Sequence, residues 1–164
     1  MRPGRYAIRL PWGKLKRRLY QGGRPGLLAR LLNRGFAAVH SARIGPDHWV
    51  TLKVVGRRSG RAISFPLVMV VLDGERYLVS MLGRDVAWVR NVKADAGRAV
   101  LHHGRAEPVR LEEVPIEQRA PVLKAYLQRA PGARPHIPID KDAPLEEFAA
   151  IAEQIPVFRV FAAG

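Results

Sequence analysis

The sequence predicts an α+β protein built on an antiparallel β-barrel or a strongly bent sheet of about six strands, flanked by three or four helices. Three observations favour this class. Short apolar, β-branched runs alternate with turn signals, and Asp73-Gly74 joins two of these runs as a type I′ hairpin would. No strand–helix–strand alternation of the kind that builds a parallel sheet is visible.

Each predicted strand is rich in β-branched or aromatic residues and is bounded by turn residues. Pro66 lies at the start of the second strand, which suits a strand entry or a sheet edge because proline cannot donate to a ladder. Gly104 joins the fourth and fifth strands. The predicted strands are His48–Val55, Ile63–Leu72, Glu75–Leu82, Arg98–His103, Glu107–Val114 and Pro156–Ala162.

Apolar residues at three- and four-residue spacings predict the helices. Asp85 is the predicted N-cap of the second helix, and Pro115 lies near the first turn of the third, where proline is tolerated. Ala130–Asp140 is rich in proline and is expected to be a loop or lid. The predicted helices are Gly26–Ser41, Val86–Ala94, Pro115–Arg129 and Ala143–Gln154.

Length and composition limit the possible functions. A chain of 164 residues fits one domain with its own core. The absence of cysteine excludes a disulfide framework and a thiolate metal site, and it fits a reducing, cytoplasmic compartment. No run is apolar enough for a membrane span or a signal peptide. The net charge of +14 favours anionic partners such as nucleic acid, anionic lipid or a phosphorylated cofactor.

The positive charge is concentrated near the N-terminus, where eleven Arg or Lys and no Asp or Glu precede Asp47. We therefore expect a basic arm in residues 1–25 and a single domain in residues 26–164. Apolar residues such as Trp12 and Tyr20 are interleaved with the basic ones, which suits the surface of an anionic membrane. The same composition suits a nucleic-acid backbone, or an arm packed on its own domain or on a partner subunit.

The segment Gly56–Arg61 lies between the first two predicted strands and carries three arginines and a serine. Its glycines allow a tight turn whose backbone N–H groups can form an anion-binding nest, and arginine adds planar donor forks. This pattern predicts a loop that holds an anionic ligand. The alternative is a solvated hairpin turn that is basic because the whole protein is basic.

Several familiar catalytic patterns are absent. The chain has no Walker loop, no Rossmann glycine fingerprint and no Gly-x-Ser-x-Gly elbow. The histidines have no metal-ligand spacing, and the adjacent His102 and His103 should point to opposite faces of their strand. If the protein is an enzyme, we expect a bound cofactor to carry the chemistry.

An ordered set of motifs between His48 and Phe161 resembles the deazaflavin-dependent nitroreductase family, a branch of the flavin/deazaflavin oxidoreductases with a split β-barrel fold. Each motif alone is weak, but their order and spacing together are specific. The set comprises the loop Gly56–Gly60, Pro66-Leu67, the Asp73-Gly74 hairpin, Ser80 with Gly83, the segment Trp88–Asn91 and the closing strand at Ile155–Val157.

The resemblance implies hydride transfer from reduced coenzyme F-420 to a quinone-like, nitro or other conjugated acceptor. This coenzyme carries a phosphate and an acidic oligoglutamate tail. The family loop that meets these anions matches Arg57, Arg58 and Ser59, and Arg61 and Lys53 are chemically suited to join them. The residues implied to lie around the ring are Pro66, Val68, Ser80, Gly83, Trp88 and Asn91.

Three positions depart from the family pattern. Met81 stands where members often carry a lysine, and Arg84 is the candidate to replace the charge of that lysine. Ile63 stands where a basic residue is expected. Phe148 lies where quinone-reducing members carry tyrosines, so the proton donor stays unassigned, and the sequence does not place Tyr126.

Two other functions stay open. One is an FMN- or haem-binding protein of the same fold, which the arginine-rich loop disfavours because it suits a longer polyanion. The other is a non-catalytic basic module that binds nucleic acid or an anionic membrane. The preferred reading is a cytoplasmic enzyme that reaches the inner face of the membrane through residues 1–25.

Overall fold

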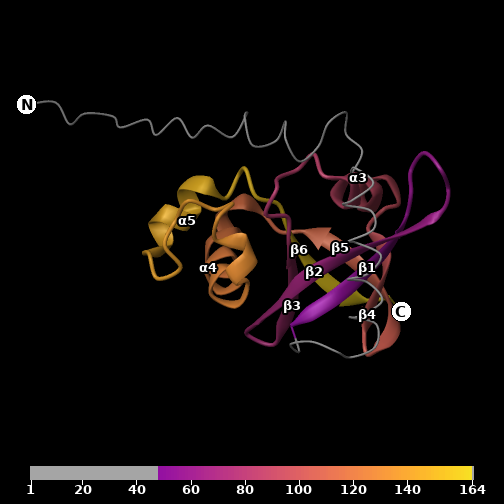
Figure 1. Ribbon diagram of the computed structural model, residues 1–164, viewed down its shortest axis with the longest axis horizontal. Helices are drawn as coiled ribbons and strands as arrows, with labels where there is room; N and C mark the ends of the chain where they lie inside the picture. The colour runs from indigo at the N-terminus through magenta and orange to yellow at the C-terminus, as the bar shows by residue number, and fades with distance from the viewer. Residues whose placement is uncertain (1–47, 164) are drawn as a thin grey trace, which may run out of the picture.

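The computed structural model describes residues 48–163. The predicted arm of residues 1–25 and the predicted helix Gly26–Ser41 lie outside these residues. Six antiparallel strands close into a barrel in the order β1-β2-β3-β6-β5-β4 (Figure 1), which confirms the predicted α+β barrel. The strands are β1 (Trp49–Val55), β2 (Ala62–Leu72), β3 (Glu75–Val79), β4 (Arg98–His103), β5 (Arg105–Glu113) and β6 (Val157–Ala162).

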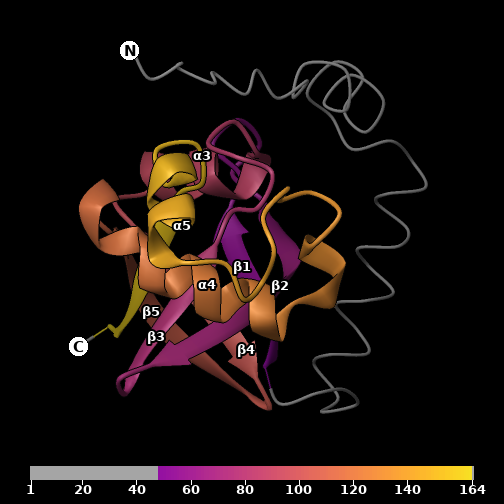
Figure 2. The same cartoon turned by 90° about the vertical axis from the view of Figure 1, so that its left-hand side faces the viewer.

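The described residues form three α-helices, α3 (Ala87–Ala94), α4 (Arg119–Arg129) and α5 (Leu145–Ile151), and 3₁₀ turns at Ile116–Gln118 and Pro131–Ala133. The helices α4 and α5 lie on one side of the barrel, and α3 lies at one end of it (Figure 1). Figure 2, viewed from the side of α4 and α5, shows both helices in front of the strands.

Two apolar cores follow from this layering. Strand alternation sends Met69 into the barrel and Val70 outward against the helices. The barrel core is centred on Leu52, Leu78, Leu101 and Phe158, and the helical core on Val70, Leu123, Leu127, Phe148 and Ile155. All nine of these residues are 1% exposed or less, and Met69, which belongs to the barrel core, is 7% exposed.

The Asp73-Gly74 hairpin is confirmed. Asp73 has φ 52° and Gly74 has φ 78°, as both central residues of a type I′ turn require. The turn sets Leu72 opposite Glu75 and fixes the β2–β3 register. A one-residue slip in this register would exchange the inner and outer faces of β2. The turn therefore determines which side chains of β2 enter each of the two cores.

Several predicted boundaries are wrong by a few residues. The third strand ends at Val79 rather than Leu82, because the Ser80 hydroxyl donates to the Gly83 carbonyl at 2.6 Å and closes a turn. The predicted helix Pro115–Arg129 begins with a 3₁₀ turn, so α4 starts only at Arg119. The helix predicted over Ala143–Gln154 is shorter, since its N-cap Pro144 is extended at ψ 156°.

The N-cap prediction for α3 is also wrong. Val86 is the N-cap, and no side chain caps the helix. The Asp85 carboxylate instead accepts a hydrogen bond from the Arg90 guanidinium at 3.1 Å. An ion pair one turn along the helix has therefore replaced the expected cap.

Arg119 attaches the helical layer to the barrel. Its side chain is 5% exposed and donates to the carbonyls of Val114 at 2.8 Å and Ala152 at 3.1 Å. It also donates to the Glu113 carboxylate at 3.0 Å. These bonds join the start of α4, the end of β5 and the end of α5, so α4 has a fixed place on the barrel.

Two glycines with positive φ provide a test of the fold. An alanine at Gly97 (φ 81°) would place its Cβ 2.4 Å from the Leu111 carbonyl oxygen, whereas one at Gly74 (φ 78°) would meet nothing within 4 Å. Gly74→Ala should cost about 1 kcal/mol, the price of a left-handed alanine. Gly97→Ala should cost at least about 2 kcal/mol more, because backbone must also move. Equal losses in urea unfolding would contradict this account of the β5 contact.

Candidate functional site

The site lies along the first part of β2, which pairs with β1 but not with β3. Residues Ala62–Val68 of β2 pair with β1, whereas Met69–Leu72 pair with β3. Within the described residues, the first part of β2 therefore has a strand partner on one edge alone. A free strand edge presents peptide donors and acceptors that a ligand can use.

The alternating direction of the hydrogen bonds along β2 shows which peptide groups face this free edge. The Met69 N–H donates to the His48 carbonyl at 2.7 Å, on the β1 side. Because peptide directions alternate along a strand, the groups of Leu67 also face β1, and those of Val68 and Pro66 face the free edge. Pro66 lies opposite Thr51 at a position where a missing N–H costs no ladder bond. Pro66 lies within β2, which begins at Ala62, rather than at the predicted strand start, and of the two placements considered, strand entry or sheet edge, its position fits the edge.

A cavity of about 520 Å³ adjoins the free edge. This volume is within the range of about 300–1,000 Å³ that is usual for small-molecule sites. One wall is β2 from Phe65 to Val68 and another is the turn Ser80–Leu82 with Trp88. The wall opposite is formed by Tyr126 and the residues from Ala130 to Ala133. Trp49, Val79 and Val86 complete the described lining.

The turn after β3 is fixed by its own hydrogen bonds. The Ser80 N–H donates to the Pro156 carbonyl and the Gly83 N–H to the Ser80 carbonyl, both at 2.9 Å. Gly83 has φ 91°, a conformation that favours glycine. The Arg84 guanidinium donates to the Glu153 carbonyl at 3.0 Å, which ties the turn to the segment after α5. Ser80 thus lines the cavity, while Gly83 and Arg84 lie outside the cavity lining and stabilise the turn through their hydrogen bonds.

The helix α3 connects the cavity to the basic loop. Trp88 lines the cavity, is 5% exposed, and packs edge-on against Phe158 with ring centroids 5.3 Å apart. One turn later, Asn91 is 2% exposed, and its Oδ1 accepts from the Arg57 guanidinium at 3.0 Å and from the Arg57 N–H at 3.3 Å. The loop and the cavity therefore share one supporting helix.

The basic loop is a tight turn with free cations. The Gly60 N–H donates to the Gly56 carbonyl and the Gly56 N–H to the Arg61 carbonyl, both at 2.8 Å. The Arg61 N–H donates to the Ser59 hydroxyl at 3.3 Å. No carboxylate within residues 48–163 pairs with Arg57, Arg58 or Arg61, although other cations there, such as Arg98, have acidic partners. Arg58 and Arg61 are exposed, so the loop presents uncompensated charge to an anion.

Lys53 lies apart from the cavity lining. It points to the outside of β1, where it faces Ser64 of β2 and Val100 of β4 across the ladder. Burial, with a further contribution from the Lys53 charge, lowers the pKa of His102. The structure therefore separates three groups: a cavity group of Pro66, Val68, Ser80 and Trp88, a loop group of Arg57, Arg58, Ser59 and Arg61 with Asn91, and Lys53 on the outer face.

Sequence reasoning missed the wall made by α4. Tyr126 is 4% exposed, and burial raises the pKa of its phenol to about 12. Its hydroxyl makes no hydrogen bond within residues 48–163. In the sequence Tyr126 reads as one more member of an apolar helical stripe. The signal that could have found it is a hydroxyl at the end of that stripe, just before the small residues Ala130 to Ala133.

Residues 48–163 contain no group of three or more His, Cys, Asp or Glu that could hold a metal ion. In the same range, none of the helices has both the length and the apolar character that crossing a bilayer requires.

The chain matches the model of a family described as F-420H(2)-dependent quinone reductase over residues 33–139. It is similar to a solved F-420-H2 dependent reductase (FDR-A), with 24% identity, 70% of this chain and 94% of that chain covered, and a TM-score of 0.50. A structure described as a domain-swapped dimer has 23% identity, 82% and 93% coverage, and a TM-score of 0.52. A protein of unknown function from Agrobacterium tumefaciens has 14% identity, 78% and 53% coverage, and a TM-score of 0.54. A search of curated protein sequences found no match.

The structural likenesses, all below 25% identity, show the shared barrel fold. The family model spans more than half of the chain and includes β2 with its free edge, the basic loop, α3 and α4. It confirms the resemblance to deazaflavin-dependent reductases that the sequence motifs indicate. The chain belongs to the F-420H(2)-dependent quinone reductase family, a family of oxidoreductase enzymes whose cofactor is the deazaflavin coenzyme F-420.

Proposed function

We propose that the protein transfers a hydride from reduced coenzyme F-420 to a quinone-like, nitro or other conjugated acceptor. The observation that carries this proposal is the connection through α3, which holds Trp88 against the cavity and Asn91 against Arg57. A ligand with a flat apolar end and a polyanionic end needs an apolar slot and a cationic loop at a fixed separation. One short helix supports both.

The loop suits the anionic part of the coenzyme. Arg57, Arg58 and Arg61 have no acidic partners within residues 48–163, so a phosphate or carboxylate there need not displace an existing ion pair. Ser59 adds a hydroxyl at the same turn. Arg84 is engaged with the Glu153 carbonyl and Lys53 lies on the outer face, so we expect smaller contributions from these two residues.

The cavity suits the ring. Its walls are mostly apolar, and the free edge of β2 adds the peptide groups of Val68 and Pro66. A heterocycle whose rim carries N–H and C=O groups can pair with such an edge, as an added strand does. Gly83 would contribute through the turn that positions Ser80 and Met81.

When bound, the coenzyme supplies the hydride. The chain's own residues bind and orient it: the basic loop holds its charged end, and Trp88 and β2 hold its ring beside the remaining cavity. Holding donor and acceptor in contact lowers the entropic part of the barrier. The apolar walls exclude water, which protects the reduced ring from side reactions.

We also propose a role for the basic N-terminal residues. Residues 1–25 would form an arm distinct from the domain of residues 26–164 and bring a cytoplasmic enzyme to an anionic membrane surface, where apolar acceptors partition. This proposal rests on their composition. Removing residues 1–25 should abolish binding to phosphatidylserine-containing liposomes and leave coenzyme binding intact. Unchanged liposome binding would show that the arm is not the anchor.

Coenzyme binding tests the proposed function directly. The double variant Arg57→Ala/Arg58→Ala should bind F-420 at least about tenfold more weakly than wild type, because two unpaired cations are lost; this equals about 1.4 kcal/mol. Titration of deazaflavin fluorescence would measure it, with FMN in parallel. Arg98→Ala/Arg110→Ala removes the same charge from residues with acidic partners and is expected to bind normally. Absence of F-420 binding to wild type would refute the proposal.

Asn91 offers a second test, because it positions Arg57 from within the protein. Asn91→Ala removes the acceptor of two Arg57 hydrogen bonds. It should weaken binding of intact F-420 by about tenfold, yet leave a deazaflavin without phosphate and tail within about twofold of wild type. Lys93→Ala on the same helix, whose partner is Glu113, is the control. An equal loss for both ligands would mean that Asn91 shapes the ring slot instead.

A further inference from the structure

The loop between β1 and β2 is a continuously exposed part of the domain. The seven residues from Arg57 to Ile63 are all exposed, and this connection projects beyond the barrel in Figure 1. None of them belongs to either apolar core. The turn can therefore open for a binding partner without disturbing the packing of the domain, because local opening costs little where few apolar contacts are lost.

Ser59 is the accessible aliphatic hydroxyl of this domain. Within residues 48–163, Thr51 and Ser80 are each 2% exposed, Ser64 is half-buried in β2, and Ser59 alone is exposed. Its Oγ accepts a hydrogen bond from the Arg61 N–H at 3.3 Å and, among the described residues, donates none. The hydroxyl can thus react without breaking a bond that it donates. The complete set of serines and threonines in the chain is Ser41, Thr51, Ser59, Ser64 and Ser80.

The residues around Ser59 are those that an arginine-directed protein kinase selects. Arg57 and Arg58 come directly before Ser59, and no other serine or threonine of the chain has two cations directly before it. Kinases of this class choose such serines because carboxylates in their substrate groove bind the arginines. Arg57 and Arg58 have no carboxylate partner within residues 48–163, so no ion pair there has to be broken.

A phosphate on Ser59 would change the charge of the loop. It adds about −1.5 to −2 charges at neutral pH and three strong acceptor oxygens. These oxygens would lie among the guanidinium groups of Arg57, Arg58 and Arg61 and would accept their hydrogen bonds. The loop would then offer little net positive charge to a second polyanion.

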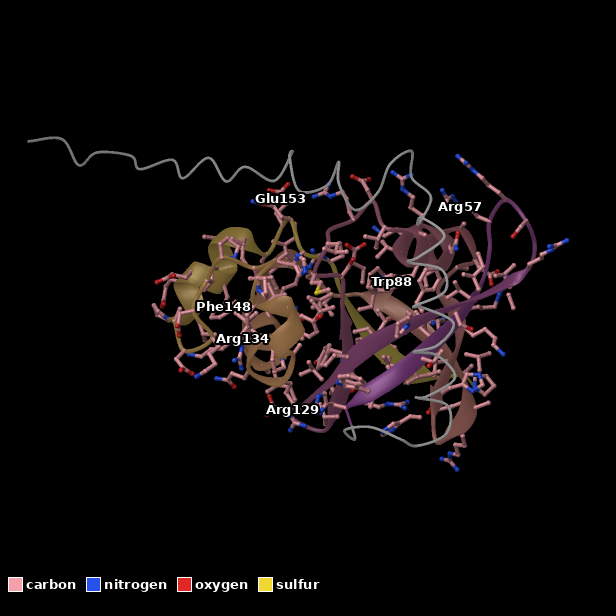
Figure 3. The ribbon with its side chains drawn as sticks, in the orientation of Figure 1. Arg57, Trp88, Arg129, Arg134, Phe148 and Glu153 are labelled. Carbon is pink, nitrogen blue, oxygen red and sulfur yellow. The ribbon has the colours of Figure 1, made fainter. Side chains whose placement is uncertain are left out.

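The same phosphate would leave the ring slot intact. No residue from Gly56 to Arg61 is among the described lining of the cavity. Figure 3 shows Arg57 on the far side of Trp88 from Phe148 and Arg134. A change at the loop tip therefore separates the affinity for a charged tail from the affinity for an apolar ring.

We propose that Ser59 is a phosphorylation site for an arginine-directed protein kinase, and that its phosphate excludes the anionic end of the coenzyme and so switches the enzyme off. The regulatory part of this inference rests on the proposed function. The kinase transfers the γ-phosphoryl group of a nucleoside triphosphate to Ser59 Oγ. The bond from the γ-phosphorus to the bridging oxygen breaks, the bond to Oγ forms, the hydroxyl proton passes to the catalytic base of the kinase, and a nucleoside diphosphate leaves.

Phosphate incorporation tests the site itself. The full chain, incubated with ATP and the catalytic subunit of cAMP-dependent protein kinase, should gain one phosphate in intact-protein mass spectrometry. Ser59→Ala should gain none. Ser64→Ala is the matched control, because Ser64 lies three positions after Arg61, and it should still gain one. A wild type without phosphate, or a Ser59→Ala variant that still gains one, would overturn the inference.

Coenzyme binding tests the switch. Phosphorylated wild type should bind F-420 at least about tenfold more weakly than the unphosphorylated protein, and a deazaflavin without phosphate and tail within about twofold. Ser59→Asp should bind F-420 at least about threefold more weakly than Ser59→Asn, which has the same shape without the charge. Equal F-420 affinity in either comparison would overturn the switch. If unphosphorylated wild type does not bind F-420, the proposed function fails instead, so the two failures are distinguishable.

Discussion

The unequal pairing of β2 is the constraint on which the site depends. β2 has eleven residues and β3 has five, so β3 can cover only the second part of β2. The first part keeps one edge free, and the cavity opens along it. An exposed strand edge normally invites aggregation. Here Pro66 removes one donor from the edge, and the surrounding walls enclose it.

The basic loop and the helical layer are both attached to elements that surround this cavity. α3 packs Trp88 into the barrel core and bonds Arg57 through Asn91, so the loop is anchored to the helix that lines the cavity. On the other side, Arg119 fixes the start of α4 to β5 and α5. The two ends of the site are thus set by contacts of two buried polar side chains, Asn91 and Arg119, and leaving a buried polar group without its partner is costly.

The elements that the sequence predicts well are those with local causes. Alternating apolar residues and the Asp73-Gly74 turn determine the β2–β3 hairpin within a few residues of chain. The features that sequence reasoning missed join distant positions. Arg57 meets Asn91 across 34 residues and Arg84 meets Glu153 across 69. The placement of Tyr126 in the cavity wall likewise depends on how α4 docks, which no local pattern encodes.

The position of Phe148 in the folded chain gives a physical reason for its departure from the family pattern. Phe148 is 0% exposed and packs in the helical core, and it lies away from Trp88 in Figure 3. A hydroxyl at that position would need a partner inside an apolar cluster, which is costly. In this chain α5 therefore serves the core, while α4 brings a phenol to the cavity. Tyr126 packs in the same helical core as Phe148 and also lines the cavity, so the two helices place their aromatic side chains differently with respect to it.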